Sequence, residues 1–189
     1  MQNFWCKNPQ ATADAVRRRW PKSAEHTIFI ADEICHGRYL FRDHWEMEPT
    51  HTAVDFGTEV AGIDWAAVPF GDVEWLYAMN RHTGFVNLAK AWLYTGDDHY
   101  AQHFAALLDD WIARVPLTEE SAPNTWRSLE TGLRCENWLR AAALLADSGV
   151  LTDERRARMD ASLVQHGEYL VRSYDTFHKL SNWGILQDN

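Results

Sequence analysis

The sequence lacks the features that mark several large protein classes. Its three cysteines, at positions 6, 35 and 135, are odd in number and show no C-x-x-C spacing, which argues against a disulfide framework. They are typical of free, buried thiols in a reducing compartment. Basic residues are sparse as well, since the longest run is "RRR" at 17–19 and the net charge is −9. A nucleic-acid-binding surface needs a basic stripe, so no nucleic acid is expected as a partner.

Long apolar runs are also missing. No stretch is long enough to span a bilayer, and the opening "MQNFWCKNPQ" has no apolar core of the kind found in a signal peptide. We therefore expect no membrane partner, and a cytoplasmic location is favoured over a periplasmic one. The motifs G-x-S-x-G, G-x-x-x-x-G-K-[ST] and G-x-G-x-x-G do not occur. Nothing in the sequence indicates a nucleotide site or a Ser–His–Asp triad.

A metal site finds little support. His99 and His103 lie four residues apart and could form half of a site on one helix, but no third ligand is apparent and H-E-x-x-H is absent. The chain is expected to hold no metal and no cofactor.

Aromatic residues, by contrast, are abundant. Ten tryptophans occur in 189 residues, more than a core of this size needs, and each indole N–H requires a partner when it is buried. Tryptophan is common where sugars bind, because its ring stacks on the apolar face of a pyranose. The alternative, which we prefer for most of the ten, is that they fill the spaces between helices.

Apolar residues recur with a helical period over most of the chain. The clearest stripe consists of Tyr100, Phe104, Leu107, Leu108 and Trp111. It predicts a helix that begins after Gly96, is capped by Asp97 or Asp98, and ends before Pro116. Residues 73–96 predict the helix before it, and the short "TGDD" connection folds the two into an antiparallel hairpin.

A second hairpin is predicted over residues 125–149 and 152–174. Its turn contains Asp147, Ser148 and Gly149, and Thr152 caps the returning helix. Two shorter helices are expected around 12–20 and 26–35, separated by Pro21. Residues 37–72 have no sustained period and read as a long irregular segment with a short extended piece at 38–41. The fold class is therefore all-α, a single domain of helical hairpins over residues 1–189.

One line of polar residues runs along the helix predicted near 126–146. Arg127, Glu130, Arg134 and Asn137 fall at i, i+3, i+7 and i+10, with Trp126 and Trp138 close by. The plain interpretation is a solvated face with weak Arg–Glu pairs. The functional interpretation is a stripe facing a cleft, where the two guanidinium groups could bind carboxylate or sulfate.

The first hairpin carries a similar line. Asn80, Gly84, Asn87 and Ala91 share one face if residues 73–96 form a continuous helix. Two amides between small residues suit neither an outer surface nor a core, since buried amides need partners. A groove for a ligand satisfies both objections, with Arg81 and His82 at its edge.

Four segments taken in order resemble the N-terminal helical domain of heparinase II/III-like polysaccharide lyases, and also oligoalginate lyases. They are "FRDHWEMEP" with "GIDW", then "DVEWLYAMNRHTGFVNLAKAWLYTGDDHYAQHFAALLDDWI", then "WRSLETGLRCENWLRAAALL", then "KLSNWGILQDN". The resemblance spans residues 28–189. It implies a partial (α/α) toroid followed by a β-sandwich domain, with the active site in the cleft between them. The chain would then be the N-terminal piece of a longer enzyme, inactive alone.

The chemistry that the resemblance implies is β-elimination at a uronic acid. An Asn in the family motif that "SNWG" matches neutralises the substrate carboxylate, which points to Asn182 as a catalytic residue. Many relatives have His directly after this Asn, whereas here Trp183 follows and could stack on a sugar. The catalytic Tyr and the other His of the family lie beyond these 189 residues, as would any structural metal of the β domain.

The partner implied by the resemblance is an acidic polysaccharide or oligosaccharide. Two alternatives stay open: an (α/α)-barrel glycoside hydrolase with paired carboxylates, and a non-catalytic glycan-binding domain. A toroid that lacks its later hairpins exposes apolar helix faces, so a homodimer through those faces is also expected.

Overall fold

The computed structural model describes residues 7–42 and 49–173. The helices are α1 (Pro9–Arg19), α2 (Pro21–Cys35), α3 (Val73–Arg81), α4 (Thr83–Thr95), α5 (Asp98–Arg114), α6 (Ser128–Leu144) and α7 (Asp153–Ser173). Two short strands, β1 (Arg38–Tyr39) and β2 (Val54–Asp55), and two 3₁₀ turns, η1 (Val60–Gly62) and η2 (Pro69–Gly71), lie in the segment between α2 and α3. In its described part, residues 37–42 and 49–72, the segment predicted as irregular contains these short elements and no α-helix, as expected.

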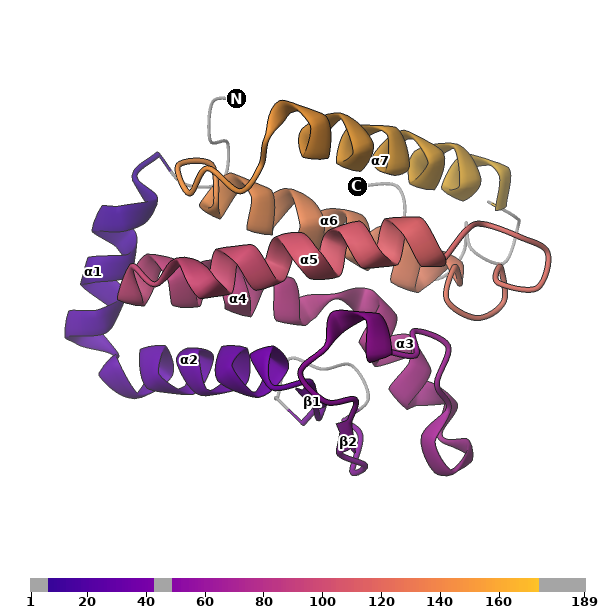
Figure 1. Ribbon diagram of the computed structural model, residues 1–189, viewed down its shortest axis with the longest axis horizontal. Coiled ribbons are helices and arrows are strands. Elements are labelled where there is room, and N and C mark those ends of the chain that lie inside the picture. Colours follow the sequence, from indigo (N-terminus) through magenta and orange to yellow (C-terminus); the bar gives the residue numbers. More distant parts are fainter. Residues whose placement is uncertain (1–6, 43–48, 174–189) are drawn as a thin grey trace, which may run out of the picture.

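The helices are arranged in two layers of hairpins. Helices α2, α4 and α6 contact one another in succession, α5 packs on α4, α7 packs on α6, and α5 also contacts α7. Figure 1 shows α2, α4, α5, α6 and α7 running along the long axis, with α1 crossing one end. This arrangement is the all-α partial toroid of helical hairpins that was predicted. None of the described helices is both long and apolar enough to cross a membrane.

The helix ends follow the sequence signals closely. The Asp97 carboxylate accepts from the His99 backbone N–H at 3.1 Å and caps α5, while Gly96 takes a left-handed conformation (φ 74°) that few other residues adopt at low cost. Pro21 occupies the first turn of α2, and the Thr152 hydroxyl accepts from the Arg155 N–H at 3.2 Å at the start of α7. The predicted caps of both hairpins are confirmed.

Tryptophans fill the interior between the layers. The buried ones are Trp65, Trp75, Trp111, Trp126 and Trp138, each no more than 4% exposed. Each of their indole N–H groups has an acceptor, among them Asp110 for Trp65 at 2.7 Å and the Val115 carbonyl for Trp126 at 3.0 Å. The preferred interpretation of most tryptophans as helix-spacing core residues is thus correct for these five. Trp20 is more than half exposed.

The first predicted helix differs from the structure in one important way. Residues 73–96 form two helices, α3 and α4, because His82 adopts a left-handed conformation (φ 56°, ψ 34°) between them. The break changes the direction of the chain, so Asn80 and Asn87 do not share a face. The expected continuous line from Asn80 through Gly84 to Ala91 is wrong for this reason.

The segment between α2 and α3 is held to the helices by specific contacts. Arg38 pairs with Asp55 and Tyr39 with Val54 in the antiparallel β1–β2 ladder. The Trp75 indole donates to the Thr52 carbonyl at 2.9 Å. Further along, Arg114 of α5 donates to the carbonyls of Ala61 and Ile63 at 3.2 and 2.9 Å. These bonds fix the segment as one wall beside α2, α3 and α4.

Candidate functional site

The polar line of α6 lies buried against the break between α3 and α4. Arg134 Nη1 donates to the Asn80 carbonyl at 2.8 Å, and Asn137 Nδ2 donates to the Arg81 carbonyl at 2.8 Å. A helix leaves its last carbonyls without intrahelical donors, and burial makes that costly. The α6 side chains supply donors for α3, which explains why a polar stripe can face the core here.

Arg134 is the centre of this network. It is completely buried and also donates to the Thr125 carbonyl at 3.1 Å and to Nε2 of His166 at 2.9 Å. Its guanidinium lies 4.2 Å from the ring centroid of Trp111, a cation–π contact. Burial lowers the pKa of Arg134 to about 9. No carboxylate bonds to it among the described residues, so backbone carbonyls and aromatic rings balance its charge.

A second buried cluster joins α3 and α6 through Glu130. The Glu130 carboxylate is fully buried and accepts from Arg81 Nη2 at 3.0 Å and from Arg127 Nε at 2.5 Å and Nη2 at 2.8 Å. Arg127 is 20% exposed, and its guanidinium carbon lies 3.6 Å above the ring of Tyr77. Arg81 also pairs with Glu74 at 3.4 Å.

These positions correct two expectations about the polar line. Glu130, Arg134 and Asn137 are at most 8% exposed, so the line is not a solvated face. These three side chains do not line an open cleft either. They are buried, and their hydrogen bonds go to other groups of the protein. Arg127 is the member of the line that reaches the surface. Any role in binding substrate stays a prediction for all four.

Asn80 and Trp126, also predicted to bind substrate, are core residues. The Asn80 amide donates to the carbonyls of Trp65 and Leu76, both at 2.9 Å, and accepts from the Trp111 indole at 3.0 Å. Three partners satisfy most of its hydrogen-bonding capacity. The hydrogen-bond partners that a buried amide needs are therefore supplied by core residues and not by a ligand. Trp126 is 1% exposed.

His82 has a defined protonation state. The Trp138 indole, which can only donate, lies 2.8 Å from Nδ1 of His82. Nδ1 must therefore be the acceptor nitrogen of a neutral ring, and Nε2 carries the proton. Burial, helped by the charges of Arg134 and His166, lowers the pKa of His82 well below its ordinary value. The Nε2–H has no hydrogen-bond partner among the described residues.

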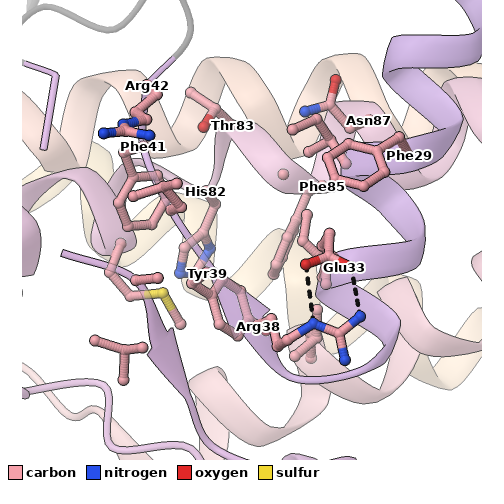
Figure 2. Close-up of a pocket in the computed structure, with 18 of the residues that line it drawn as sticks. Phe29, Glu33, Arg38, Tyr39, Phe41, Arg42, His82, Thr83, Phe85 and Asn87 are labelled. Carbon is pink, nitrogen blue, oxygen red and sulfur yellow. Dashed lines mark hydrogen bonds and ion pairs between the residues drawn. The ribbon is translucent and has the colours of Figure 1, made fainter. Parts of the chain in front are cut away.

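A cavity of about 370 Å³ opens on the other side of His82. Its walls come from α2, the β1–β2 segment, the start of α4 and Trp65 (Figure 2). Most of the lining is apolar, for example Phe29, Phe41 and Phe85. Asn87, predicted to face a groove, does line this cavity together with Thr83 and Gly84.

Tyr39 lines the same cavity and carries another of the buried polar atoms that have no partner among the described residues. Its side chain is 7% exposed, and its hydroxyl makes no hydrogen bond to the described residues. Burial raises the pKa of Tyr39, so the phenol stays protonated. At the wall, Arg38 forms a two-point ion pair with Glu33, seen as dashed lines in Figure 2. The pattern of the sequence did not point to Tyr39, because only the fold brings β1 and the start of α4 to the same cavity.

Asn182 and Trp183 lie outside the described residues. Within the described part of the chain, no group of three or more His, Cys, Asp or Glu side chains is placed to hold a metal ion. The His99 imidazole pairs with Asp97 at 2.8 Å. Tyr77 and Glu74, which join the Arg81–Arg127 cluster, were not anticipated from the sequence.

Paired helices packed in two layers place the described part of the chain in the all-α class. The family model described as "Heparinase II/III N-terminus" matches residues 13–189. The chain therefore belongs to the heparinase II/III N-terminal family.

Known relatives agree with this assignment. The chain is 25% identical over 163 residues to a heparin-sulfate lyase from Bacteroides stercoris, covering 77% of this chain and 23% of the relative. It is 23% identical over 167 residues to a heparin-sulfate lyase from Bacteroides thetaiotaomicron, covering 87% and 23%. The fold matches heparan sulfate lyase HepC from Pedobacter heparinus with a TM-score of 0.73 at 22% identity, over 86% of this chain and 24% of that one. The chain spans about a quarter of the length of these relatives.

Proposed function

We propose that this chain is the N-terminal helical domain of a polysaccharide lyase that cleaves a uronic-acid-containing polysaccharide by β-elimination. The observation that carries the proposal is the family match, which runs from residue 13 to residue 189 and so includes the "SNWG" sequence. The relatives matched over most of this chain are heparin-sulfate lyases, which makes heparan sulfate the first substrate to test.

The chemistry requires neutralisation of a carboxylate before a proton is removed. The C5 proton of a uronate is weakly acidic, and the charge that develops on its carboxylate must be stabilised by a donor in place beforehand. Asn182 is the residue that we assign to this role. Negative charge increases on the carboxylate oxygens as the proton leaves, so an amide N–H bonded to them stabilises the developing enolate more than the ground state.

The described residues would contribute the rigid wall that carries this site. Arg134, Glu130 and Asn137 tie α6 to α3 with buried hydrogen bonds, and such supported frames hold side chains to the accuracy that catalysis needs. Arg127, partly exposed and stacked on Tyr77, is the predicted residue best placed to contact a sulfate or carboxylate. Asn80, Trp126 and Arg134 would act by positioning, not by contact.

The test is product analysis with the complete gene product. Heparan sulfate and alginate are incubated in parallel, and absorbance near the ultraviolet edge is followed together with new reducing ends. A lyase yields an unsaturated uronyl group and a reducing end for each cleavage. Reducing ends without the chromophore would indicate the hydrolase alternative, and neither signal on any uronan would overturn the proposal.

A further inference from the structure

We propose that the solvent-facing stripe of α4, together with Phe29 of α2, is a binding subsite for one acidic sugar unit of the polysaccharide. The proposal rests on the function proposed above and adds residues to it. Asn87 and Lys90 would hold polar groups of the sugar, and Phe29 would pack against its ring. Phe29 and Asn87 both line the cavity of about 370 Å³, which is open to solvent, so a polymer chain can lie across it.

One stripe of α4 reaches solvent although α2, α5 and α6 all pack on this helix. Thr83, Asn87 and Lys90 fall at i, i+4 and i+7, which places them on the same side of the helix. All three are half-buried, whereas Phe85 and Leu88 on the other sides are buried. The accessible part of the central helix is therefore polar, as a sugar-binding surface requires.

Two groups of this stripe have hydrogen-bonding capacity to spare. Within the described part of the chain, the Asn87 amide makes no hydrogen bond and Lys90 pairs with no carboxylate. Burial, and after it the charge of nearby Arg140, lowers the pKa of Lys90. Arg140 is itself paired with Glu136 at 3.2 Å. A half-buried ammonium close to a second cation is stabilised by an anion, and a ligand can bring one.

Phe29 supplies the apolar part of the subsite. Its side chain is 57% exposed, and it lines the same cavity as Asn87 (Figure 2). A single exposed apolar residue is ordinary in a soluble protein. The position of Phe29 is informative because it combines an aromatic ring with an unpaired amide. The C–H groups on one face of a pyranose pack on such a ring, while its hydroxyls bond to the amide.

The charges around the cavity favour an acidic sugar over a neutral one. Of the two carboxylates in its wall, Glu33 is paired with Arg38. The other, on Asp55, accepts from the Gly57 backbone N–H at 2.7 Å. Arg42 also lines the cavity, is exposed, and has no ion pair within the described residues. The wall is thus balanced in charge before the α4 ammonium is added, although the whole chain carries −9.

The experiment measures binding of a size-defined heparan sulfate hexasaccharide to the purified 189-residue chain by isothermal titration calorimetry. Two further probes are titrated in parallel: cellohexaose, a neutral sugar of equal length, and hexaglutamate, which has the charge without the sugar. We expect saturable binding of the heparan sulfate hexasaccharide that weakens as sodium chloride is added. Both other probes should bind more weakly, because each lacks one of the two features that the subsite recognises.

Two variants locate the binding, and each has a matched control. Phe29→Ala should weaken binding of the hexasaccharide about fivefold, for loss of a partly buried aromatic contact. Lys90→Gln keeps most of the stem and should weaken it about three- to tenfold. The controls are Phe70→Ala, a 95% exposed ring outside the cavity, and Arg172→Gln, a 68% exposed cation on α7. Both should leave the affinity unchanged.

Three results would overturn the subsite: no saturable binding of the hexasaccharide, equal affinity for hexaglutamate, or unchanged affinity in both Phe29→Ala and Lys90→Gln. Circular dichroism of each variant shows that a loss of binding is not a loss of fold. The lyase assay of the complete gene product separates this inference from the proposed function. Chromophore formation without binding at these residues would overturn the subsite alone, whereas binding without chromophore formation would overturn the lyase.

Discussion

The indole N–H of Trp138 donates to Nδ1 of His82 at 2.8 Å, across the interface between α6 and the break that separates α3 from α4. This one contact joins the polar line of α6 to the cavity on the far side of His82. It fixes the tautomer of the imidazole and supports a left-handed residue in the core.

The tautomer of His82 can be measured directly. Nitrogen-15 shifts of the imidazole should show Nδ1 as the unprotonated nitrogen and Nε2 as the protonated one. The ring should stay neutral at pH values at which a solvent-exposed imidazole is already protonated, since burial lowers its pKa well below the ordinary value. In Trp138→Phe, Nδ1 loses its donor and the tautomers should mix. Protonation on Nδ1 in the unmodified chain would contradict the hydrogen bond.

Glu130→Gln should destabilise the fold strongly. Glu130 is completely buried and pairs with both Arg81 and Arg127, so loss of its charge removes the carboxylate closest to two guanidinium groups and leaves Arg81 with the longer pair to Glu74 at 3.4 Å. Removal of one partner from a buried pair costs about 3–5 kcal/mol. The free energy of unfolding in urea measures the effect.

The matched control for this change is Glu136→Gln on the same helix. Glu136 pairs with Arg140 at 3.2 Å, but both side chains are more than 40% exposed. Exposed pairs contribute about 0–1 kcal/mol, so the control should change stability little. Equal losses at Glu130 and Glu136 would contradict the buried cluster.

Acid should destabilise the protein through His166. Its Nδ1 bonds to the Ser162 carbonyl at 2.6 Å, so Nε2 accepts from Arg134, and burial lowers the pKa of His166 to about 2. In the unfolded chain the His166 imidazole binds a proton near pH 6.5, whereas in the folded protein it stays neutral down to about pH 2. The free energy of unfolding therefore falls as pH falls from 6.5 towards 2. The expected loss is about 1.4 kcal/mol per pH unit from this group.

Urea unfolding at a series of pH values tests this slope. His82 contributes in the same direction, because its pKa is lowered as well. In His166→Gln the amide can still accept from Arg134. The slope of unfolding free energy against pH below pH 6.5 should decrease by the contribution of one proton, about 1.4 kcal/mol per pH unit. An unchanged slope in that variant would show that His166 is protonated in the folded state.

The wall of the cavity depends on Gly37. Gly37 and Gly57 have nearly the same left-handed φ, 73° and 74°, but a Cβ on Gly37 would lie only 1.8 Å from the Gly57 carbonyl oxygen, whereas one on Gly57 meets nothing within 4 Å. Gly57→Ala should cost about 1–2 kcal/mol for the backbone conformation alone. Gly37→Ala should cost about 1–3 kcal/mol more, the usual range for overpacking. Equal unfolding energies for the two variants would contradict the close approach.

Much of the fold follows from local signals in the sequence. The stripe from Tyr100 to Trp111, the caps at Asp97 and Thr152, and Pro21 each depend on neighbouring residues, and each was placed correctly. The family could also be inferred from ordered motifs. Local periodicity is sufficient to predict a helix and its ends wherever the helix buries one face and ends at a cap.

The site could be predicted only in part, because its features depend on tertiary partners. The helical period of residues 73–96 hides the break at His82, which is stabilised by donors from Arg134 and Asn137 far along the chain. The sequence pattern identified the residues of the polar line on α6 correctly. It could not predict their burial, because that depends on the packing of α6 against α3. Tyr39 and His82 line the same cavity although they lie far apart in the sequence. No pattern within either segment predicts this proximity.

The central claim is that this chain supplies the carboxylate-neutralising amide of a uronan lyase, and the most direct measurement is the rate of unsaturated uronyl formation by the complete gene product. With heparan sulfate as substrate, the unmodified protein should produce the ultraviolet chromophore. Asn182→Ala should abolish it while the circular dichroism spectrum stays helical. Chromophore formation by Asn182→Ala at the unmodified rate would contradict the claim.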